Sequence, residues 1–454
     1  MSTVSPTRVD EPAWVRDAIW WHVYPLGFVG AEAESARDQP VTHRLGHLAG
    51  WLDHAVELGA SGLALGPIFA SQTHGYDTTD HLRVDPRLGD DGDLDALIAG
   101  CGERGLRVML DGVFNHVGRG HPAFQSVLEQ GPDAPTASWF RLRWPGAQPW
   151  EPGVEPEYDD FEGHHALVAL DHRSPAVVDH VVEVMTTWLD RGVDAWRLDA
   201  AYAVPASFWS QVAERVRARH PDAYLMGELI HGDYGDFVRG ARVHAVTQYE
   251  LWKAIWSALN DRNFFELDAA LTRHAGFLEH FVPYTFVGNH DVTRIASRLD
   301  DERHLQHALV VLLTTGGTPA VYAGDEYAFR GVKEDRAGGD DAVRPAFPAA
   351  PDDLAPESLA PYRLHQELIG LRRRHGWLHT ARTTTVHLSN AELVYEVTAE
   401  GERLVVVLSV SDDAVVVPAD RAGELLAGSA ELLDAGTDRT RVRVPPHGWA
   451  VLSG

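Results

Sequence analysis

A ten-residue stretch, GVDAWRLDAA at residues 192–201, places a cation and a carboxylate at the end of a short apolar run. Arg197 and Asp199 are two residues apart, so on a β-strand their side chains point to the same side. A buried charge costs free energy unless it faces a partner or a cavity. Arg197 also favours the ionised form of Asp199, and an ionised carboxylate can act as a nucleophile. Taken alone, the pair is equally compatible with a structural ion pair.

Three more acidic residues, Asp111, Glu228 and Asp291, stand at or near the ends of other apolar runs. Eight such runs are predicted strands that alternate with predicted helices, one of which covers residues 43–58. The strands are predicted at residues 18–25, 62–69, 107–116, 193–199, 224–229, 245–249, 284–291 and 319–323. This alternation predicts an α/β fold of the (β/α)8 TIM barrel type, in which the carboxyl ends of the strands surround the active site. We therefore expect the acids to meet there.

The rhythm of strands and helices divides the chain into four parts. Residues 1–116 are predicted to form the first part of the barrel. After the third strand, residues 117–165 are rich in Pro, Gly, Trp and Glu and are predicted to be a short inserted subdomain. Residues 166–376 complete the barrel. The short β-rich runs of residues 377–454 predict a C-terminal all-β domain, a β-sandwich.

Composition excludes several classes of function. The 454 residues carry a formal net charge of −27, which argues against nucleic acid or an anionic membrane surface as the partner. The only cysteine is Cys101, so neither an intrachain disulfide nor a cysteine-based zinc site is expected. Residues 1–14 are polar and lack the apolar core of a secretory signal, and no apolar run is long enough to span a bilayer. We expect a cytoplasmic location, while the sequence leaves the oligomeric state open.

Four segments resemble the signature regions of the α-amylase family, glycoside hydrolase family thirteen, in the order that the family has them. They are DGVFNH at 111–116, GVDAWRLDA at 192–200, GEL at 227–229 and FVGNHD at 286–291. The resemblance, which covers nearly the whole chain, is to intracellular α-glucosidases and oligosaccharide hydrolases. It implies a retaining α-glycoside hydrolase that cleaves α-glucosidic bonds of oligosaccharides or disaccharides through a covalent glycosyl-enzyme intermediate.

The resemblance also implies roles for individual residues. Asp199 resembles the nucleophile, Glu228 the general acid/base, and Asp291 the third carboxylate, which holds sugar hydroxyls. Arg197 resembles the arginine that positions the nucleophile, and Asp111 the acid that braces it.

Three residues match groups that contact the reacting sugar: His116 and His290 resemble histidines that bind hydroxyls, and Tyr76 resembles the tyrosine that stacks on the ring. Arg344 resembles an arginine that pairs, in exo-acting α-glucosidases, with an acid three residues before the tyrosine. Here that position is Thr73, so Arg344 is expected to lack this partner. Exo and endo action therefore both remain open.

No cofactor is predicted. Calcium-binding members of the family often have Lys and His just beyond the nucleophile, where this chain has Tyr202 and Ala203. Asn115 and the acid-rich segment 151–162 still offer oxygen ligands, so calcium is possible without support from the sequence.

Two alternatives to hydrolysis stay open. A transglycosylase or isomerase of α-glucosides would use the same site, with a sugar instead of water attacking the intermediate. A sugar-binding pseudoenzyme would keep the acids without turnover. The sequence does not determine the linkage or the sugar preference.

Overall fold

The computed structural model describes residues 9–36, 38–145, 150–336, 338–354, 359–433 and 439–454. Part of the polar N-terminal segment on which the location argument rests, residues 1–8, lies outside the described residues.

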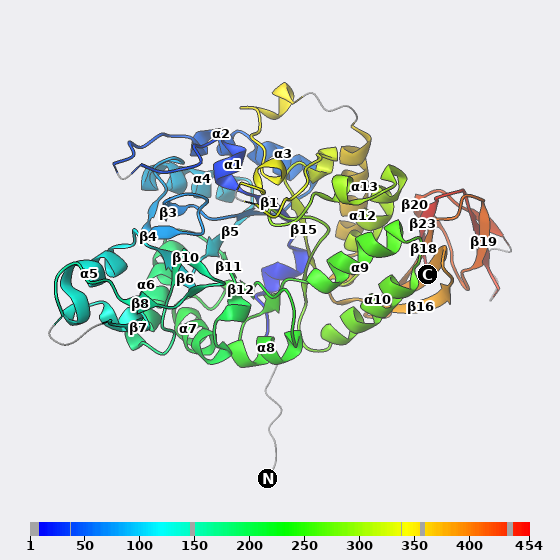
Figure 1. Cartoon of the computed structure of the whole chain (residues 1–454). Helices are drawn as coiled ribbons and strands as arrows, with labels where there is room; N and C mark the ends of the chain where they lie inside the picture. The colour runs from blue at the N-terminus through cyan, green and yellow to red at the C-terminus, as the bar shows by residue number, and fades with distance from the viewer. Residues whose placement is uncertain (1–8, 37, 146–149, 337, 355–358, 434–438) are drawn as a thin grey trace, which may run out of the picture.

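Eight parallel strands form the centre of the molecule, hydrogen-bonded in the order β13-β12-β11-β5-β2-β1-β15-β14 (Figure 1). An isolated parallel bridge from Thr247 to Tyr284, with a 2.9 Å bond from the Gln248 amide to the Tyr284 carbonyl, joins the two ends of the sheet. The sheet is therefore a closed barrel, and the predicted TIM barrel is confirmed. Its strands are β1 (Trp20–Val23), β2 (Gly62–Leu65), β5 (Arg107–Gly112), β11 (Ala195–Leu198), β12 (Tyr224–Gly227), β13 (Ala245–Val246), β14 (Tyr284–Phe286) and β15 (Thr318–Tyr322).

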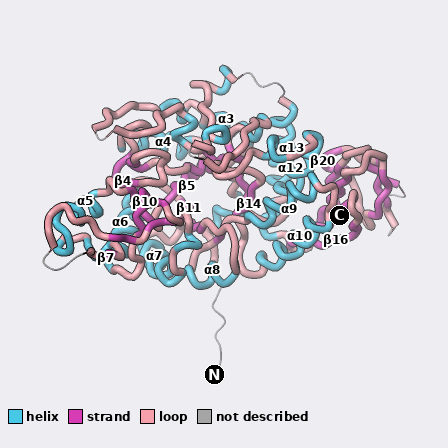
Figure 2. Tube along the Cα trace, viewed as in Figure 1, coloured by secondary structure: helices cyan, strands magenta, loops and turns pink. Residues whose placement is uncertain are grey.

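Helices surround these strands (Figure 2). The predicted helix at 43–58 is wrong as a single element, because it breaks into α2 and α3 at Gly50 and Trp51. Glycine is a poor helix former, and the buried Trp51 indole donates to the Pro348 carbonyl at 3.0 Å. The helices are α1 (Pro25–Phe28), α2 (Leu45–Ala49), α3 (Leu52–Leu58), α4 (Asp91–Glu103), α5 (Pro122–Gln130), α6 (Pro175–Asp190), α7 (Ala206–Arg219), α8 (Tyr234–Ala241), α9 (Tyr249–Asn260), α10 (Phe265–Phe277), α11 (Ile295–Arg298), α12 (Leu305–Thr314) and α13 (Ala360–Arg374).

The barrel interior is a packed core of its own. Large rings and small side chains alternate around it, as a tapering barrel requires. The large members are Trp20, Tyr224, Tyr284 and Phe286, and the small ones are Ala64, Ala195, Ala245 and Ala320. A much larger apolar cluster lies between the strands and the surrounding helices. The polar site is thus built on a rigid apolar base.

The third barrel strand ends earlier than predicted. β5 stops at Gly112, and His116–Gly118 form a separate strand, β6, in a sheet with β10 (His164–Ala169) and β9 (Asp160–Phe161). A Cβ at Gly112 would lie 2.3 Å from the Phe114 ring, so the chain folds back over this glycine. The β6-β10-β9 sheet extends across positions 117 and 165, so the limits of the inserted subdomain stay a prediction. The segment also holds α5 and the β7 (Leu142–Arg143) and β8 (Glu157–Tyr158) pair.

The C-terminal part is all-β, as predicted. A five-stranded antiparallel sheet, β16-β17-β18-β23-β20, faces a three-stranded one, β19-β22-β21. Val394 and Val407 of the first sheet share an apolar cluster with Val417 and Val442 of the second. The strands are β16 (Arg382–Leu388), β17 (Glu392–Ala399), β18 (Glu402–Ser409), β19 (Val415–Pro418), β20 (Leu425–Gly428), β21 (Glu431–Leu433), β22 (Arg441–Val444) and β23 (Trp449–Ser453), and β3 (Phe69–Ser71) pairs with β4 (Thr78–Val84) beside the barrel. Among the described residues, no helix is long and apolar enough to cross a membrane.

One buried ion pair ties together the loops that follow β14 and β15. The Arg294 guanidinium donates to Asp325 Oδ1 at 2.8 Å and to the Ala323 carbonyl at 3.0 Å. Both charged side chains are almost fully buried. The pair therefore fixes the loop that carries Asp291.

We predict that Arg294→Met lowers the free energy of unfolding by about 3–5 kcal/mol, because it leaves Asp325 buried without its cation. Arg303→Met is the matched control, since it removes an exposed arginine from the Asp301 pair, and should cost less than about 1 kcal/mol. Urea unfolding at pH 7 measures both. Equal losses in the two variants would contradict the assigned role of the buried pair.

Candidate active site

Four carboxylates from four parts of the barrel surround one arginine. Arg197 Nη1 lies 2.6 Å from Asp111 Oδ2 and 3.2 Å from Asp199 Oδ1. Its Nη2 lies 2.7 Å from Glu228 Oε1 and 3.9 Å from Asp291 Oδ2. The structure therefore brings together the three acids predicted to be catalytic and the acid predicted to brace the arginine.

Strand register explains this convergence. Arg197 on β11 pairs with Asp111 on β5 and with Met226 on β12, so all three lie at one level of the barrel. Side chains alternate along β11, and Arg197 points toward the axis while Trp196 joins the outer apolar cluster. The acids that follow β11 and β12 then stand one layer above the guanidinium.

Glu228 is held by two further groups. Its Oε2 accepts a 3.0 Å bond from the Ala200 amide, and its Oε1 accepts a 3.2 Å bond from the Tyr249 hydroxyl. Ala200 adopts a left-handed conformation with φ 43°, which is strained for a residue with a Cβ. This turn directly after Asp199 aims the amide at Glu228. Asn289 Nδ2 donates to the Tyr249 hydroxyl at 2.9 Å and so orients it.

Burial shifts the proton affinity of this cluster. Burial and the nearby Glu228 carboxylate raise the pKa of Asp199 well above its ordinary value, although Arg197 opposes the shift. Burial also raises the pKa of Asp111 to about 6, again against Arg197. Arg197 alone therefore does not keep Asp199 ionised, in contrast to the prediction from the sequence, because one cation serves several buried acids. The cluster as a whole retains a proton more readily than isolated carboxyl groups do.

The pKa of Asp291 shifts in the opposite direction, below its ordinary value. Burial alone would raise its pKa, but contacts with His290, Arg344 and Arg197 outweigh burial and hold the pKa below its ordinary value. Arg344 Nη2 lies 2.9 Å from Asp291 Oδ1. Asp291 therefore stays ionised beside the other acids.

Tyr76 lines the site, and the fully buried His290 is stacked against its ring. Their rings stack with centroids 5.7 Å apart, and the Tyr76 hydroxyl contacts His290 Nε2 and, at 3.2 Å, Asp111 Oδ2. Burial lowers the pKa of His290 well below its ordinary value, so the ring is neutral. Its Nε2 also lies 3.1 Å from Asp291 Oδ2.

His116 lines the same cavity, but both of its ring nitrogens are engaged. Nε2 donates to the Tyr76 carbonyl at 2.9 Å, and Nδ1 accepts from Asn115 Nδ2 at 3.0 Å. Gly118, two residues on, lets the backbone lie against Asp77, because a Cβ at position 118 would lie 2.4 Å from the Asp77 carbonyl oxygen. A sugar hydroxyl must therefore displace one of these bonds, and the hydroxyl-binding role of His116 stays a prediction.

Arg344 finds partners other than an acid at position 73. Its Nη2 lies 3.0 Å from Asp340 Oδ2 as well as close to Asp291, and its guanidinium lies 4.5 Å from the centre of the Tyr24 ring. Thr73 instead donates to Asp77 Oδ2 at 2.8 Å. Thr73 thus does not contribute to an exo-type pair, and Arg344 braces Asp291 instead.

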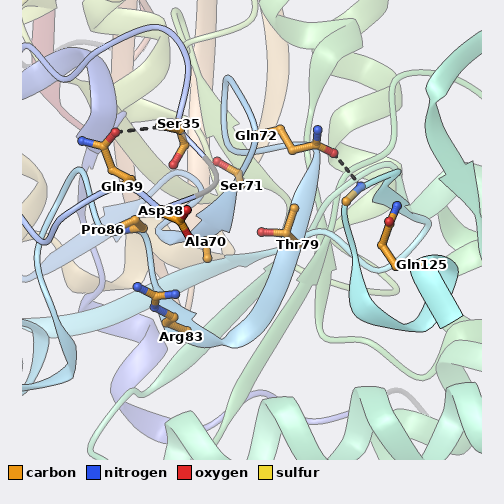
Figure 3. A pocket seen from close by; sticks show the side chains of 12 residues that line it. Ser35, Asp38, Gln39, Ala70, Ser71, Gln72, Thr79, Arg83, Pro86 and Gln125 are labelled. Carbon is orange, nitrogen blue, oxygen red and sulfur yellow. Dashed lines mark hydrogen bonds between the residues drawn. The ribbon is translucent and has the colours of Figure 1, made fainter.

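The acids open into a cavity of about 430 Å3, whose lining includes Tyr76, His116, Asp199, Glu228, Tyr249 and Asp291. A neighbouring cavity of about 960 Å3 shares Trp252, Asp291, Val292 and Lys333 with it, so the two form one continuous depression. A separate polar cavity of about 580 Å3 lies between residues 35–36 and 38–39 on one side and the β3–β4 hairpin on the other (Figure 3). None of the four acids lines that cavity.

Comparison with known proteins identifies the family of this chain. The profile of the α-amylase catalytic domain matches residues 22–385. The chain belongs to the α-amylase family. A cyclomaltodextrinase of Geobacillus thermopakistaniensis is 30% identical over 98% of this chain and 78% of the relative. An intracellular maltogenic amylase of Bacillus subtilis strain 168 is 27% identical over 70% of this chain and 57% of the relative.

Among solved structures, the cyclic α-maltosyl-(1→6)-maltose hydrolase of Arthrobacter globiformis superposes with a TM-score of 0.81 and 26% identity. The alignment covers 98% of this chain and all of that one. The predicted family and enzyme class are confirmed: this member of the α-amylase family is a retaining glycoside hydrolase of α-glucosidic bonds in oligosaccharides.

Sequence reasoning missed several residues of this family member's site. Tyr24 directly follows β1, and Tyr249 comes three residues after the last residue of β13, so the rule that found the acids near the strand ends also points to these tyrosines. Trp252 and Lys333 come from α9 and from the loop after β15, where no local pattern marks them.

Some of the residues considered for calcium have other partners or no ligand atom. The Asn115 carboxamide nitrogen is bonded to His116 Nδ1, and the Tyr202 hydroxyl donates at 3.0 Å to Glu162 of the acid-rich segment. Ala203 offers no side-chain oxygen, whereas calcium is held by six or more oxygen ligands. The absence of a cofactor stays a prediction.

We predict that kcat/KM falls as the pH drops through about 6, the value to which burial raises the pKa of Asp111. Below that pH Asp111 becomes neutral, so Arg197 loses its closest anion and shifts toward the other acids. A pH profile on maltotriose, restricted to conditions where the circular dichroism is unchanged, measures this limb. A constant kcat/KM down to pH 4.5 would contradict the raised proton affinity.

We also predict that Tyr249→Phe lowers kcat about 10- to 100-fold, because Glu228 loses a hydrogen bond to a charged group. Tyr395→Phe is the control, since it removes another buried hydroxyl, which contacts Thr314 away from the site. Steady-state kinetics on maltotriose compares the two. Equal kcat in both variants would show that Tyr249 does not position Glu228.

Proposed function

We propose that Asp199 is the nucleophile and Glu228 the general acid/base of a double displacement. The observation that carries this proposal is that both carboxylates are held by the two terminal nitrogens of one buried guanidinium, at the mouth of a cavity of about 430 Å3. Glu228 has two extra donors that fix its position, whereas Asp199 has one oxygen bonded to Arg197.

In the first step, Asp199 Oδ attacks the anomeric carbon while Glu228 gives its proton to the departing glycosidic oxygen. In the second step, Glu228 takes a proton from water, and the resulting hydroxide oxygen displaces Asp199. The sugar keeps its α configuration after two inversions. This first step requires a protonated Glu228 and an ionised Asp199 at the moment of attack.

The remaining predicted residues surround the reacting sugar in this proposal. Tyr76 provides a ring face for stacking, and Asp291 with His290 accepts and donates hydrogen bonds to hydroxyls. Arg344 positions Asp291 through their 2.9 Å contact. His116 closes the opposite side of the cavity.

We propose α-1,4-linked glucose oligosaccharides, linear or cyclic, as substrates. The relatives named cyclomaltodextrinase and the hydrolase of a cyclic maltosyl-maltose support this class. The adjoining cavity of about 960 Å3 supports it too, because it offers room beyond the reacting sugar and carries the Trp252 ring. A cytoplasmic location is supported by the relative named an intracellular maltogenic amylase. The relatives' names say nothing about nucleic-acid binding or about the oligomeric state.

We predict that Asp199→Asn lowers kcat/KM at least about 1,000-fold on both maltotriose and an aryl α-glucoside with a good leaving group. Glu228→Gln should lose about 10²- to 10⁴-fold on maltotriose but much less in the first step on the aryl glucoside, because that leaving group needs no proton. Asp179→Asn, an exposed acid on α6, is the control. Time-resolved proton NMR should show the α-anomer released first.

Three outcomes would overturn parts of the proposal. Turnover by Asp199→Asn at the wild-type rate would exclude Asp199 as the nucleophile. New glycosidic signals in place of free sugar would identify a transglycosylase. Silence on linear and cyclic oligosaccharides would favour the sugar-binding alternative.

A further inference from the structure

Three histidines meet outside the active site, where the insertion packs on the barrel. His81 lies on β4, His180 on α6, and His121 immediately before α5. One ring nitrogen of each lies within 4.8 Å of those of the other two. We propose that His81, His121 and His180 bind one divalent transition-metal ion, Zn²⁺, which fastens the insertion to the barrel.

The spacing within this histidine cluster fits coordination better than hydrogen bonding. His180 Nε2 and His81 Nδ1 are 3.4 Å apart. This separation is long for a hydrogen bond, which has its optimum near 2.9 Å. Two nitrogens bound tetrahedrally to one zinc ion at 2.0–2.1 Å are separated by about 3.3–3.4 Å.

His81 is already oriented for this role. Its Nε2–H donates to the Val113 carbonyl at 2.8 Å, which fixes the tautomer and leaves the Nδ1 lone pair facing the cluster. Zinc-bound histidines in proteins usually donate their other ring N–H to a carbonyl or carboxylate in the same way.

The charge state also suits a metal. Burial lowers the pKa of His81, His121 and His180 to about 3, so at neutral pH all three rings are unprotonated and able to coordinate. The donor set consists only of imidazole nitrogens, which favours zinc, cobalt or nickel over calcium or magnesium. His180 is partly exposed and gives the ion a path inward.

Two other groups of possible metal ligands in the described part of the chain are held together by short hydrogen bonds. His304 Nε2 and His447 Nδ1 are 2.9 Å apart, and His447 Nε2 contacts Asp412 at 2.8 Å, which makes a hydrogen-bonded chain. His43 bonds directly to Asp93 at 2.6 Å on the surface. In the all-histidine cluster the closest nitrogens lack such a short bond.

Metal binding by His121 has a specific structural consequence. The Ala123 amide now donates to His121 Nδ1 at 3.2 Å as the first bond of α5. Coordination through Nδ1 occupies this lone pair, and coordination through Nε2 places the proton on Nδ1. In either case the Ala123 amide loses its acceptor, so its NMR signal must move.

The experiment titrates metal-free protein with ZnCl2 by calorimetry and with Co²⁺ by visible absorption. We compare the wild type with His180→Ala, which removes the most accessible of the three side chains. The control is His280→Ala, which removes an exposed histidine outside the cluster. The wild type and His280→Ala should bind one ion with the intense spectrum of tetrahedral Co²⁺ and gain thermal stability. His180→Ala should bind at least about 100-fold more weakly.

The Ala123 amide, assigned in the full chain, provides the second readout and does not depend on any variant that might fold poorly. Its shift on adding one equivalent of Zn²⁺ supports the proposal. Unchanged Ala123 signals, or equal high-affinity binding by His180→Ala and wild type, would overturn it. Full activity of the metal-free enzyme is compatible with the proposal, so its failure stays separate from any failure of the proposed catalytic roles.

Discussion

The structure depends on one interaction, the contact of the buried Arg197 guanidinium with four carboxylates. Acids packed this closely without a cation would repel one another and lose their hydration. A single positive charge does not neutralise all of them, so burial still raises the pKa of Asp199 and of Asp111. This imbalance keeps a proton in the site, and a retaining hydrolase needs one protonated and one ionised carboxyl group together.

The barrel makes this contact possible. The four acids, Asp111, Asp199, Glu228 and Asp291, are spread over about two fifths of the sequence, and only closure of the sheet brings them within reach of one side chain. The apolar interior below them, with Trp20, Tyr224 and Tyr284, excludes water and prevents the strands from moving relative to one another. The loops after β14 and β15 are in turn tied by the Arg294–Asp325 pair.

Much of this arrangement could be predicted from the sequence. Apolar runs followed by acids located the strands and the carboxyl ends, because side-chain alternation on a strand is a local property. The same pattern did not reveal that β5 ends at Gly112, since the cause is the Phe114 ring folding back over the glycine. The Asp340 partner of Arg344 was also missed, because it lies in a long loop with no regular period.

The histidine cluster, too, could not be predicted from the sequence. His81, His121 and His180 stand on three elements at irregular intervals, so no spacing motif of a zinc site joins them in the sequence. Their proximity depends on how α5 and α6 pack beside β4. Local patterns thus predict elements and their ends, whereas contacts between loops and outer helices require the folded chain.

The central claim is that Asp199 carries the sugar between the two steps. A 5-fluoro α-glucosyl fluoride slows the second step more than release of its own leaving group, so the intermediate should accumulate. Intact mass spectrometry should then show one added fluoroglucosyl group per chain, and peptide mapping should place it on Asp199. Turnover of this substrate with the label on another residue would contradict the account.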